Sequence, residues 1–174
     1  MGAYIVEQIY DSMKLRCGNQ HFPSYADCSI CEEWLNDKNS FYQWAFQNLY
    51  NCEIDILELD KDLFSTGEKL YSPETCCFLP KRINSALVVK KKSYSIYPTG
   101  ITITGRGKYA SSVSCGSKKV RKVFDSMDEA CKFYVSTKER FIRELADYYK
   151  QFLPDRIYTA LLEYKVEQYS PYKR

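Results

Sequence analysis

The chain has 174 residues with an apolar content of 45%, which suits one ordinary domain or two small ones with a packed core. This composition excludes an intrinsically disordered chain, and no apolar run approaches the roughly 18 residues that a membrane helix needs. The first ten residues lack the basic-then-apolar order of a secretory signal, so we expect a cytoplasmic protein without a membrane partner.

The net charge of +3 hides a very uneven distribution along the chain. Residues 1–78 carry 13 acidic and 5 basic side chains, whereas no acidic residue occurs between Glu74 and Asp125. The basic residues in that gap are Lys81, Arg82, Lys90, Lys91, Lys92, Arg106, Lys108, Lys118, Lys119, Arg121 and Lys122. Charge of one sign over such a length favours a polyanionic partner, and we predict binding to double-stranded DNA.

The N-terminal part is predicted to be mainly helical. Apolar spacing predicts a helix over residues 3–16 with Ile5, Ile9 and Met13 near its buried face. Loop-forming residues follow over 18–30, and residues 31–50 form a second helical stretch with room for a break near 36–40. Its candidate core residues are Trp34, Phe41, Trp44 and Leu49.

A strand–turn–strand–helix pattern comes next. Residues 54–64 are typical of a short strand that runs into a turn, and residues 76–79 of a second strand. Pro80 begins a short helix that continues through Leu87, and the segment Lys90–Ser93 is the best candidate for a linker.

The C-terminal part is predicted to be a three-stranded meander covered by a helix. Alternating residues indicate strands over 101–105, 108–115 and 120–124, with glycine-containing turns between them. Ser126 and Glu129 form a capping box, which begins a long helix that ends near Phe152. Its apolar stripe consists of Ala130, Tyr134, Thr137, Phe141 and Leu145. Residues 155–166 form a last helix with Asp155 as its cap.

The segment Gly100–Phe141 resembles the DNA-binding fold of plant ethylene-response factors, the AP-two domain. The resemblance rests on GITITGRGKYASSV, on KVF, and on DSMDEACKFYVSTKERFI. It implies that one face of the three-stranded sheet enters the major groove of DNA, which is wide enough for a small sheet.

By position in that family, seven residues would face the groove: Thr102, Thr104, Arg106, Ser112, Ser114, Lys118 and Val120. The basic residues expected to complete the DNA-binding set are Lys108, Lys119, Arg121 and Lys122. Plant members carry Arg and Trp at many groove-facing positions, whereas this chain has mainly Thr and Ser. The resemblance therefore implies contacts with phosphates more than readout of bases.

The upstream half resembles phage-encoded HNH-type homing endonucleases that carry such a C-terminal domain. The matching stretches are RC at 16–17, CSICEEWLN at 28–36 and ELDKDLFSTGEKLYSPETCCFLPKRIN at 58–84. The resemblance places Asp60 and Asn84 where two side chains would hold a catalytic metal such as Mg²⁺, and it places Lys61 where a general base would be.

Lys61 is a poor replacement for a catalytic histidine. A lysine would need its pKa lowered by about three units to act near neutral pH, and Asp60 and Asp62 should raise it instead. The only histidine, His21, lies in a loop some forty residues earlier. We therefore expect a degenerate HNH fold that binds DNA without the histidine base. Two alternatives stay open, namely a weak metal-dependent endonuclease and a phage protein that binds and inhibits a host protein.

The eight cysteines allow two interpretations. Without a secretory signal, reduced structural thiols are expected. Cys28 and Cys31 nevertheless have the spacing of a zinc-binding pair, and Cys17 with Cys76 or Cys77 would complete a four-thiolate site.

The sequence as a whole predicts an α+β protein in two parts. Residues 1–90 would hold the helical and degenerate ββα (HNH-like) region. Residues 91–174 would hold the antiparallel sheet packed on its long helix, followed by the C-terminal helix.

Overall fold

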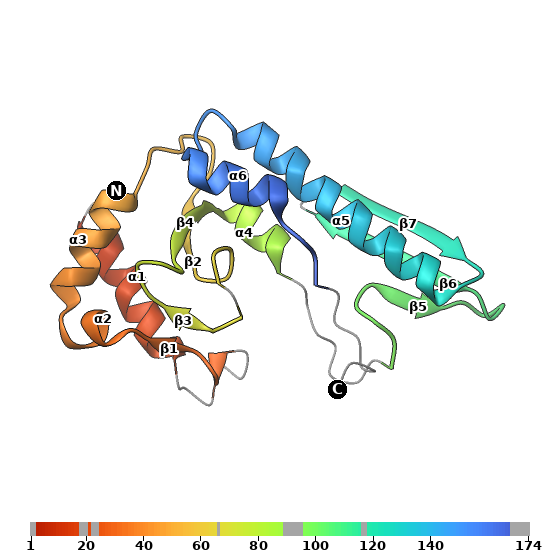
Figure 1. Cartoon of the computed structure of the whole chain (residues 1–174), viewed down its shortest axis with the longest axis horizontal. Coiled ribbons are helices and arrows are strands. Elements are labelled where there is room, and N and C mark those ends of the chain that lie inside the picture. The colour runs from red at the N-terminus through yellow and green to blue at the C-terminus, as the bar shows by residue number, and fades with distance from the viewer. Residues whose placement is uncertain are drawn as a thin grey trace. The chain divides into compact units, whose positions relative to one another are not determined.

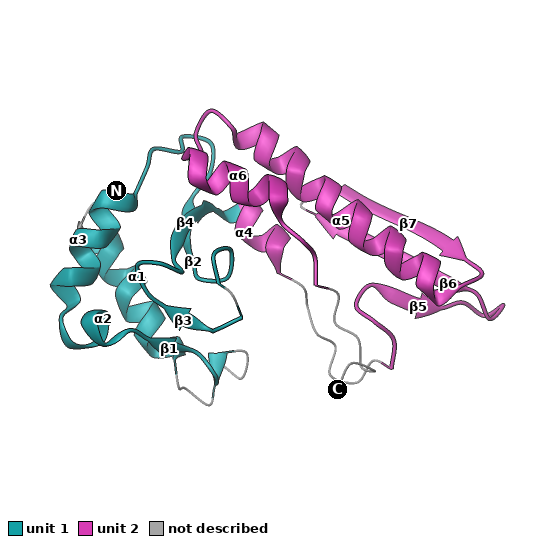
Figure 2. Ribbon diagram, viewed as in Figure 1, with its two compact units in different colours: residues 1–81 teal, residues 82–174 magenta. Residues whose placement is uncertain are grey.

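The computed structural model describes residues 3–17, 21, 25–65, 67–88, 96–115 and 118–167, and Figure 1 shows its elements in chain order. The fold is α+β, as the sequence predicts. The chain divides into two compact units, residues 1–81 and residues 82–174 (Figure 2). This division falls earlier than the expected boundary at residues 90 and 91. The expected linker Lys90–Ser93 lies outside the described residues.

Three helices begin unit 1: α1 (Ala3–Arg16), α2 (Glu32–Asn36) and α3 (Lys38–Asn48). Asp37 separates α2 from α3, because its extended backbone ends the first helix and its side chain accepts a hydrogen bond of 2.9 Å from the Asn39 N–H. An aspartate in this position satisfies a backbone donor that the helix start would otherwise leave unpaired. The expected break in the second helical stretch is thus confirmed.

An aromatic core holds unit 1 together. Trp34 and Phe41 are fully buried, and their rings meet edge to face with centroids 5.0 Å apart. The Tyr10 hydroxyl donates to the Trp34 carbonyl oxygen over 2.8 Å, which ties α1 to α2. The buried face of α1 consists of Val6, Tyr10 and Met13. The expectation that Ile5 belongs to this face was wrong, because the helix is rotated so that Ile5 is 41% exposed.

Two small sheets complete unit 1. β2 (Leu57–Asp60) pairs antiparallel with β4 (Cys77–Pro80), which confirms the two strands expected there. β1 (Ser29–Ile30) pairs in parallel with β3 (Leu70–Tyr71), inside segments expected to be loop or turn. A strand of two residues is too short to show an alternating pattern, so sequence reasoning had no signal for this pair.

Unit 2 is a three-stranded sheet covered by a long helix. β5 (Ile101–Ile103), β6 (Tyr109–Cys115) and β7 (Lys118–Phe124) form an antiparallel sheet in that order. α5 (Met127–Tyr149) runs along one face of it, as Figure 1 shows. The short α4 (Lys81–Leu87) precedes the sheet, and α6 (Asp155–Glu163) follows α5.

The ends of these helices agree only in part with the expected caps. The Ser126 hydroxyl accepts a hydrogen bond of 3.5 Å from the Glu129 N–H, so the start of α5 is confirmed. α5 ends at Tyr149 and not near Phe152. Pro154 precedes α6, and Asp155 is its first helical residue instead of its cap.

Gly100 allows α5 to pack closely on the edge of the sheet. Its φ is +81°, a backbone region that side chains disfavour, and a Cβ there would overlap the Tyr134 ring. The Ser112 N–H donates to the Gly100 carbonyl over 2.8 Å, which fixes the entry into β5. Within the described part of the chain, no helix is long and apolar enough to cross a membrane.

Candidate nucleic-acid interface

Strand alternation sorts the basic residues of β7 onto two faces of the sheet. In the register between β6 and β7, Ser112 pairs with Arg121 and Ser114 pairs with Lys119. Paired residues of an antiparallel sheet point to the same side, so these four side chains share one face. Thr102 of β5 and Val123 of β7 lie on that face too, because both pair with Ala110. We call this surface the open face.

The opposite face packs against α5. Lys118 forms an ion pair with Glu144 of α5, and Lys122 lies over the Phe133 ring of α5 at 5.7 Å from its centroid. Phe124 also packs against Phe133, with ring centroids 5.3 Å apart. Side chains on this face are therefore engaged by the helix and do not extend from the open face.

The register corrects part of the expected DNA-binding set. Lys118 and Val120 were expected to face the groove, but they pair with Cys115 and Val113 on the side of α5. Lys122 lies on that side as well. Because side chains alternate with a period of two, a shift of one residue in the expected register exchanges the two faces. Lys119 and Arg121 are instead the open-face cations, which sequence reasoning had named only as general basic contacts.

The turn between β5 and β6 carries the remaining expected residues. The Thr104 hydroxyl accepts a hydrogen bond of 3.2 Å from the Lys108 N–H, so it helps to close the turn. Gly107 takes a φ of +74° there. The Lys108 ammonium pairs with Asp125 over 2.7 Å, whereas Arg106 is exposed at the tip. Arg106 is thus the cation that the turn presents to solvent.

The open face carries positive charge, and the acidic residue that follows β7, Asp125, is paired with Lys108. Lys119 and Arg121 are both exposed, and among the described residues neither has an ion-pair partner. The sequence has no acidic residue between Glu74 and Asp125, so none can project from the three strands. Hydroxyl groups of Thr102, Ser112 and Ser114 lie among these cations. Such a combination suits contacts with phosphate oxygens.

The Asp60 carboxylate stabilises the turn that follows β2 by accepting backbone hydrogen bonds. It is 6% exposed, and its Oδ1 accepts hydrogen bonds from the N–H groups of Asp62 and Leu63 over 3.0 and 2.8 Å. Loss of solvation on burial raises the pKa of Asp60 to about 6, although the two N–H donors and Lys61 act in the opposite direction. The carboxylate therefore holds the chain as it leaves β2.

Lys61 is a buried ammonium that already has partners. Its side chain is 7% exposed, its Nζ lies 2.5 Å from Asp62 Oδ1, and it sits over the Tyr71 ring at 5.8 Å from the centroid. Burial acts to lower the pKa of Lys61, but the hydrogen bond and charge of Asp62 outweigh it, so this pKa lies above its ordinary value. A lysine that stays protonated cannot take a proton from water.

The two expected metal sites stay predictions. Across the described residues, no group of three or more His, Cys, Asp and Glu side chains is placed to hold a metal ion. Asp60 belongs to unit 1 and Asn84 to unit 2, and the magnesium site between them stays a prediction.

The cysteines named for zinc have the character of structural thiols. Burial raises the pKa of Cys17, Cys28 and Cys31, and it raises the pKa of Cys76 to about 12. All eight cysteines are free of disulfides. The zinc site at these cysteines stays a prediction beside the interpretation as reduced thiols.

Comparison of this chain with models of known protein families, with curated proteins and with solved structures finds no match. The resemblances to the AP-two domain and to HNH endonucleases thus stay expectations from the sequence.

Proposed function

We propose that this protein binds double-stranded DNA through the open face of the β5–β6–β7 sheet. The observation that carries the proposal is the alternation along β7, which turns Lys119 and Arg121 away from α5 and toward solvent. Arg106 adds a third cation at the tip of the β5–β6 turn. Exposed cations without nearby carboxylates attract a polyanion, and a small sheet fits the width of the major groove.

The composition of the open face favours duplex DNA over single strands. Proteins that hold single-stranded nucleic acid commonly stack its bases on exposed aromatic rings. The aromatic residues of the strands, Tyr109 and Phe124, pair with each other and lie on the side of α5. The open face offers hydroxyl and cationic groups instead, which contact the phosphates of a duplex.

The same composition implies weak discrimination between sequences. Serine and threonine hydroxyls bond to any of several base edges and to phosphate oxygens, whereas a bidentate arginine contributes about 1–3 kcal/mol of discrimination at one base pair. Arg121 is the one arginine on the strands of the open face. We expect affinities for unrelated duplexes of equal length to agree within about tenfold.

The decisive experiment compares two double variants of the same strand. Lys119→Ala with Arg121→Ala removes the open-face cations, and Lys118→Ala with Lys122→Ala removes equal charge from the side of α5. Fluorescence anisotropy with a labelled duplex at several salt concentrations measures both affinity and salt dependence.

For three phosphate contacts, log K should fall with log salt at a slope of about −3, because each neutralised phosphate contributes about −0.9. The open-face double variant should reduce this slope to about −1. The variant on the side of α5 should keep the wild-type slope. Equal loss in both double variants would show that binding follows net charge alone, and no binding by the wild-type protein at low salt would refute the proposal outright.

A further inference from the structure

β7 is an edge strand of the sheet in unit 2, and one side of its backbone is unpaired. It pairs with β6 over its whole length, from Lys118 to Phe124, and the sheet ends there (Figure 1). Among the described residues, no hydrogen bond reaches the outer N–H and C=O groups of this strand. A regular strand of seven residues therefore presents a row of donors and acceptors to which a further strand can pair.

The side chains along this edge form two unlike rows. On the open face, Lys119 and Arg121 are exposed, and within the described part of the chain neither forms an ion pair or a hydrogen bond. On the side of α5, Val120 and Phe124 are half-buried, and the Phe124 ring lies against the half-buried Phe133 of the helix. A strand added to β7 would thus meet cations on one face and apolar groups on the other.

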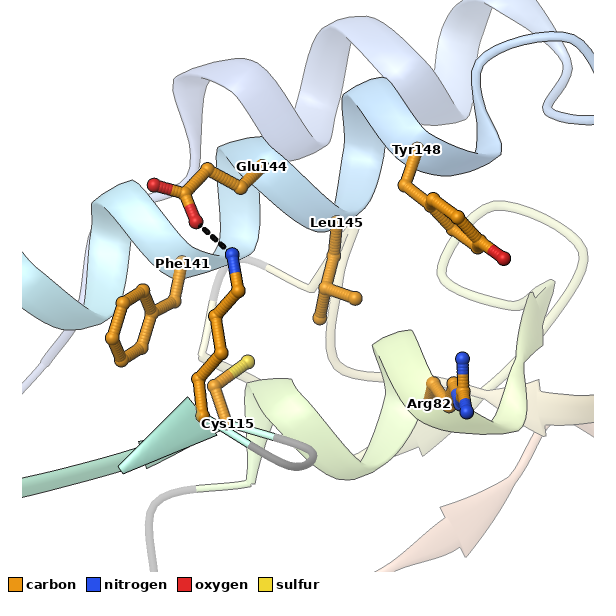
Figure 3. Close-up of a pocket in the computed structure, with 7 residues that line it drawn as sticks. Arg82, Cys115, Phe141, Glu144, Leu145 and Tyr148 are labelled. Atoms are coloured by element: carbon orange, nitrogen blue, oxygen red, sulfur yellow. Dashed lines mark hydrogen bonds and ion pairs between the residues drawn. The ribbon is translucent and has the colours of Figure 1, made fainter. Parts of the chain in front are cut away.

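The cations of β7 on the side of α5 are already engaged. Lys118 forms an ion pair with Glu144, which Figure 3 marks with a dashed line. The Lys122 ammonium lies over the rings of Phe124 and Phe133, 5.3 and 5.7 Å from their centroids. An added strand therefore needs no carboxylates on this side, whereas the two cations of the open face are available for them.

The charge of β7 discriminates between possible occupants of its edge. Pairing with β7 of a second copy would place like charges opposite one another, because four of its seven residues are cationic: Lys118, Lys119, Arg121 and Lys122. Lysines on an edge strand commonly oppose such pairing between copies. A segment with carboxylates on the side of the open face replaces this repulsion by attraction.

We propose that the outer edge of β7 binds an acidic extended segment of another protein, which adds a fourth strand to the sheet. Its acidic residues would lie beside Lys119 and Arg121, and its apolar residues would pack toward Val120 and Phe133. Because side chains alternate between the faces of a strand, the segment is expected to alternate acidic and apolar residues. This partner goes beyond the proposed binding of DNA and does not depend on it.

The test is fluorescence anisotropy of the full chain with a labelled peptide in which glutamate and valine alternate. Two control peptides carry the same charge. In one, all the glutamates precede all the valines, so the two residue types cannot separate onto two faces. In the other, proline replaces valine and removes N–H donors from the strand. We expect saturable binding of the alternating peptide, with each control at least about tenfold weaker.

Two double variants of β7 distinguish its two faces. Lys119→Ala with Arg121→Ala should weaken binding of the alternating peptide about fivefold, since exposed ion pairs each contribute little. Lys118→Ala with Lys122→Ala removes the same charge from the side of α5 and should change the affinity by less than about twofold. Melting curves establish that each variant is folded before its affinity is interpreted.

Absence of saturable binding of the alternating peptide to the folded wild-type protein at low salt would overturn the proposal. Equal affinity for all three peptides, or equal losses in the two double variants, would also overturn it, because attraction would then follow net charge alone. Dimers of the protein that the peptide dissociates would assign the edge to a second copy instead. These measurements contain no DNA, so failure of the peptide to bind leaves the proposed function to its own test.

Discussion

Replacement of Asp60 by asparagine is expected to stabilise unit 1 at neutral pH. Asparagine keeps a side-chain oxygen to accept the two N–H groups of Asp62 and Leu63, but it carries no charge that burial would penalise. The change therefore isolates the electrostatic cost of a buried carboxylate from the benefit of its hydrogen bonds.

The sign and size of the effect follow from the raised pKa of Asp60. This pKa rises from 3.8 in the unfolded chain to about 6 in the fold, so the folded protein binds the proton more tightly. The contribution of Asp60 to stability is fully present below pH 3.8 and is lost as the pH rises through 6. The difference amounts to about 3 kcal/mol, of which about 2 kcal/mol falls between pH 4 and pH 7.

Urea unfolding of the wild type and of Asp60→Asn at several pH values measures this quantity. The chain has two tryptophans, Trp34 and Trp44, and both lie in the core of unit 1, so their fluorescence reports the unfolding of that unit. Asp27→Asn serves as the control, because it removes one negative charge from a side chain that is 82% exposed.

Relative to the wild type, Asp60→Asn should gain about 2 kcal/mol of unfolding free energy between pH 4 and pH 7. Asp27→Asn should show little trend. A flat difference for Asp60→Asn, or one that falls with rising pH, would mean that the Asp60 carboxylate is solvated, contrary to the structure.

Three further predictions concern unit 2 and the chemistry of unit 1. Gly100→Ala should lower the unfolding free energy by at least about 2 kcal/mol, because it adds both backbone strain and overlap with a neighbouring side chain. Gly107→Ala should lower it by about 1 kcal/mol from strain alone, and Gly105→Ala by almost nothing. Thermal melts followed by circular dichroism measure the three variants, and a different order of stabilities would contradict the prediction. Burial lowers the pKa of Lys138 from its ordinary 10.5, so the unfolded chain binds that proton more tightly than the folded protein does. The stability of the wild type, relative to Lys138→Met, should therefore rise as the pH increases toward 10.5. Chemical unfolding of both proteins at pH 8 and pH 10 measures this difference, and no rise would contradict the prediction. With Mg²⁺ or Mn²⁺ the protein should nick supercoiled DNA no faster than with EDTA, because Lys61 stays protonated and cannot act as a base. Rapid metal-dependent nicking would favour the endonuclease alternative. The variant Lys61→His tests whether a histidine at this position restores cleavage.

Local patterns in the sequence were sufficient for most of the helices and strands. The period of 3.6 residues marked α1 and α5, a break near residues 36–40 was expected without its cap being identified, and alternation marked the three strands of unit 2. These features depend on interactions between residues near each other in the chain, so a single sequence reports them. The charge asymmetry is likewise a property of the sequence alone.

Non-local pairing decided what local patterns could not. The parallel pair β1 and β3 joins segments about forty residues apart, each too short to carry a periodic signal. The buried face of α1 depended on how the helix is rotated against Trp34 and Phe41, and a rotation by one residue exchanges Ile5 for Val6.

For the candidate interface too, the sequence determined some features and the tertiary structure determined others. The sequence by itself determined that residues 75–124 carry only positive charge and that Arg121 belongs to a strand, whereas Lys119 joins that strand only in the structure. Only the register between β6 and β7, together with the side on which α5 packs, decided that these two cations are exposed while Lys118 and Lys122 contact the helix. The physical reason is that side chains of a strand alternate between faces, so the partner strand and the covering helix determine which half of them meets solvent.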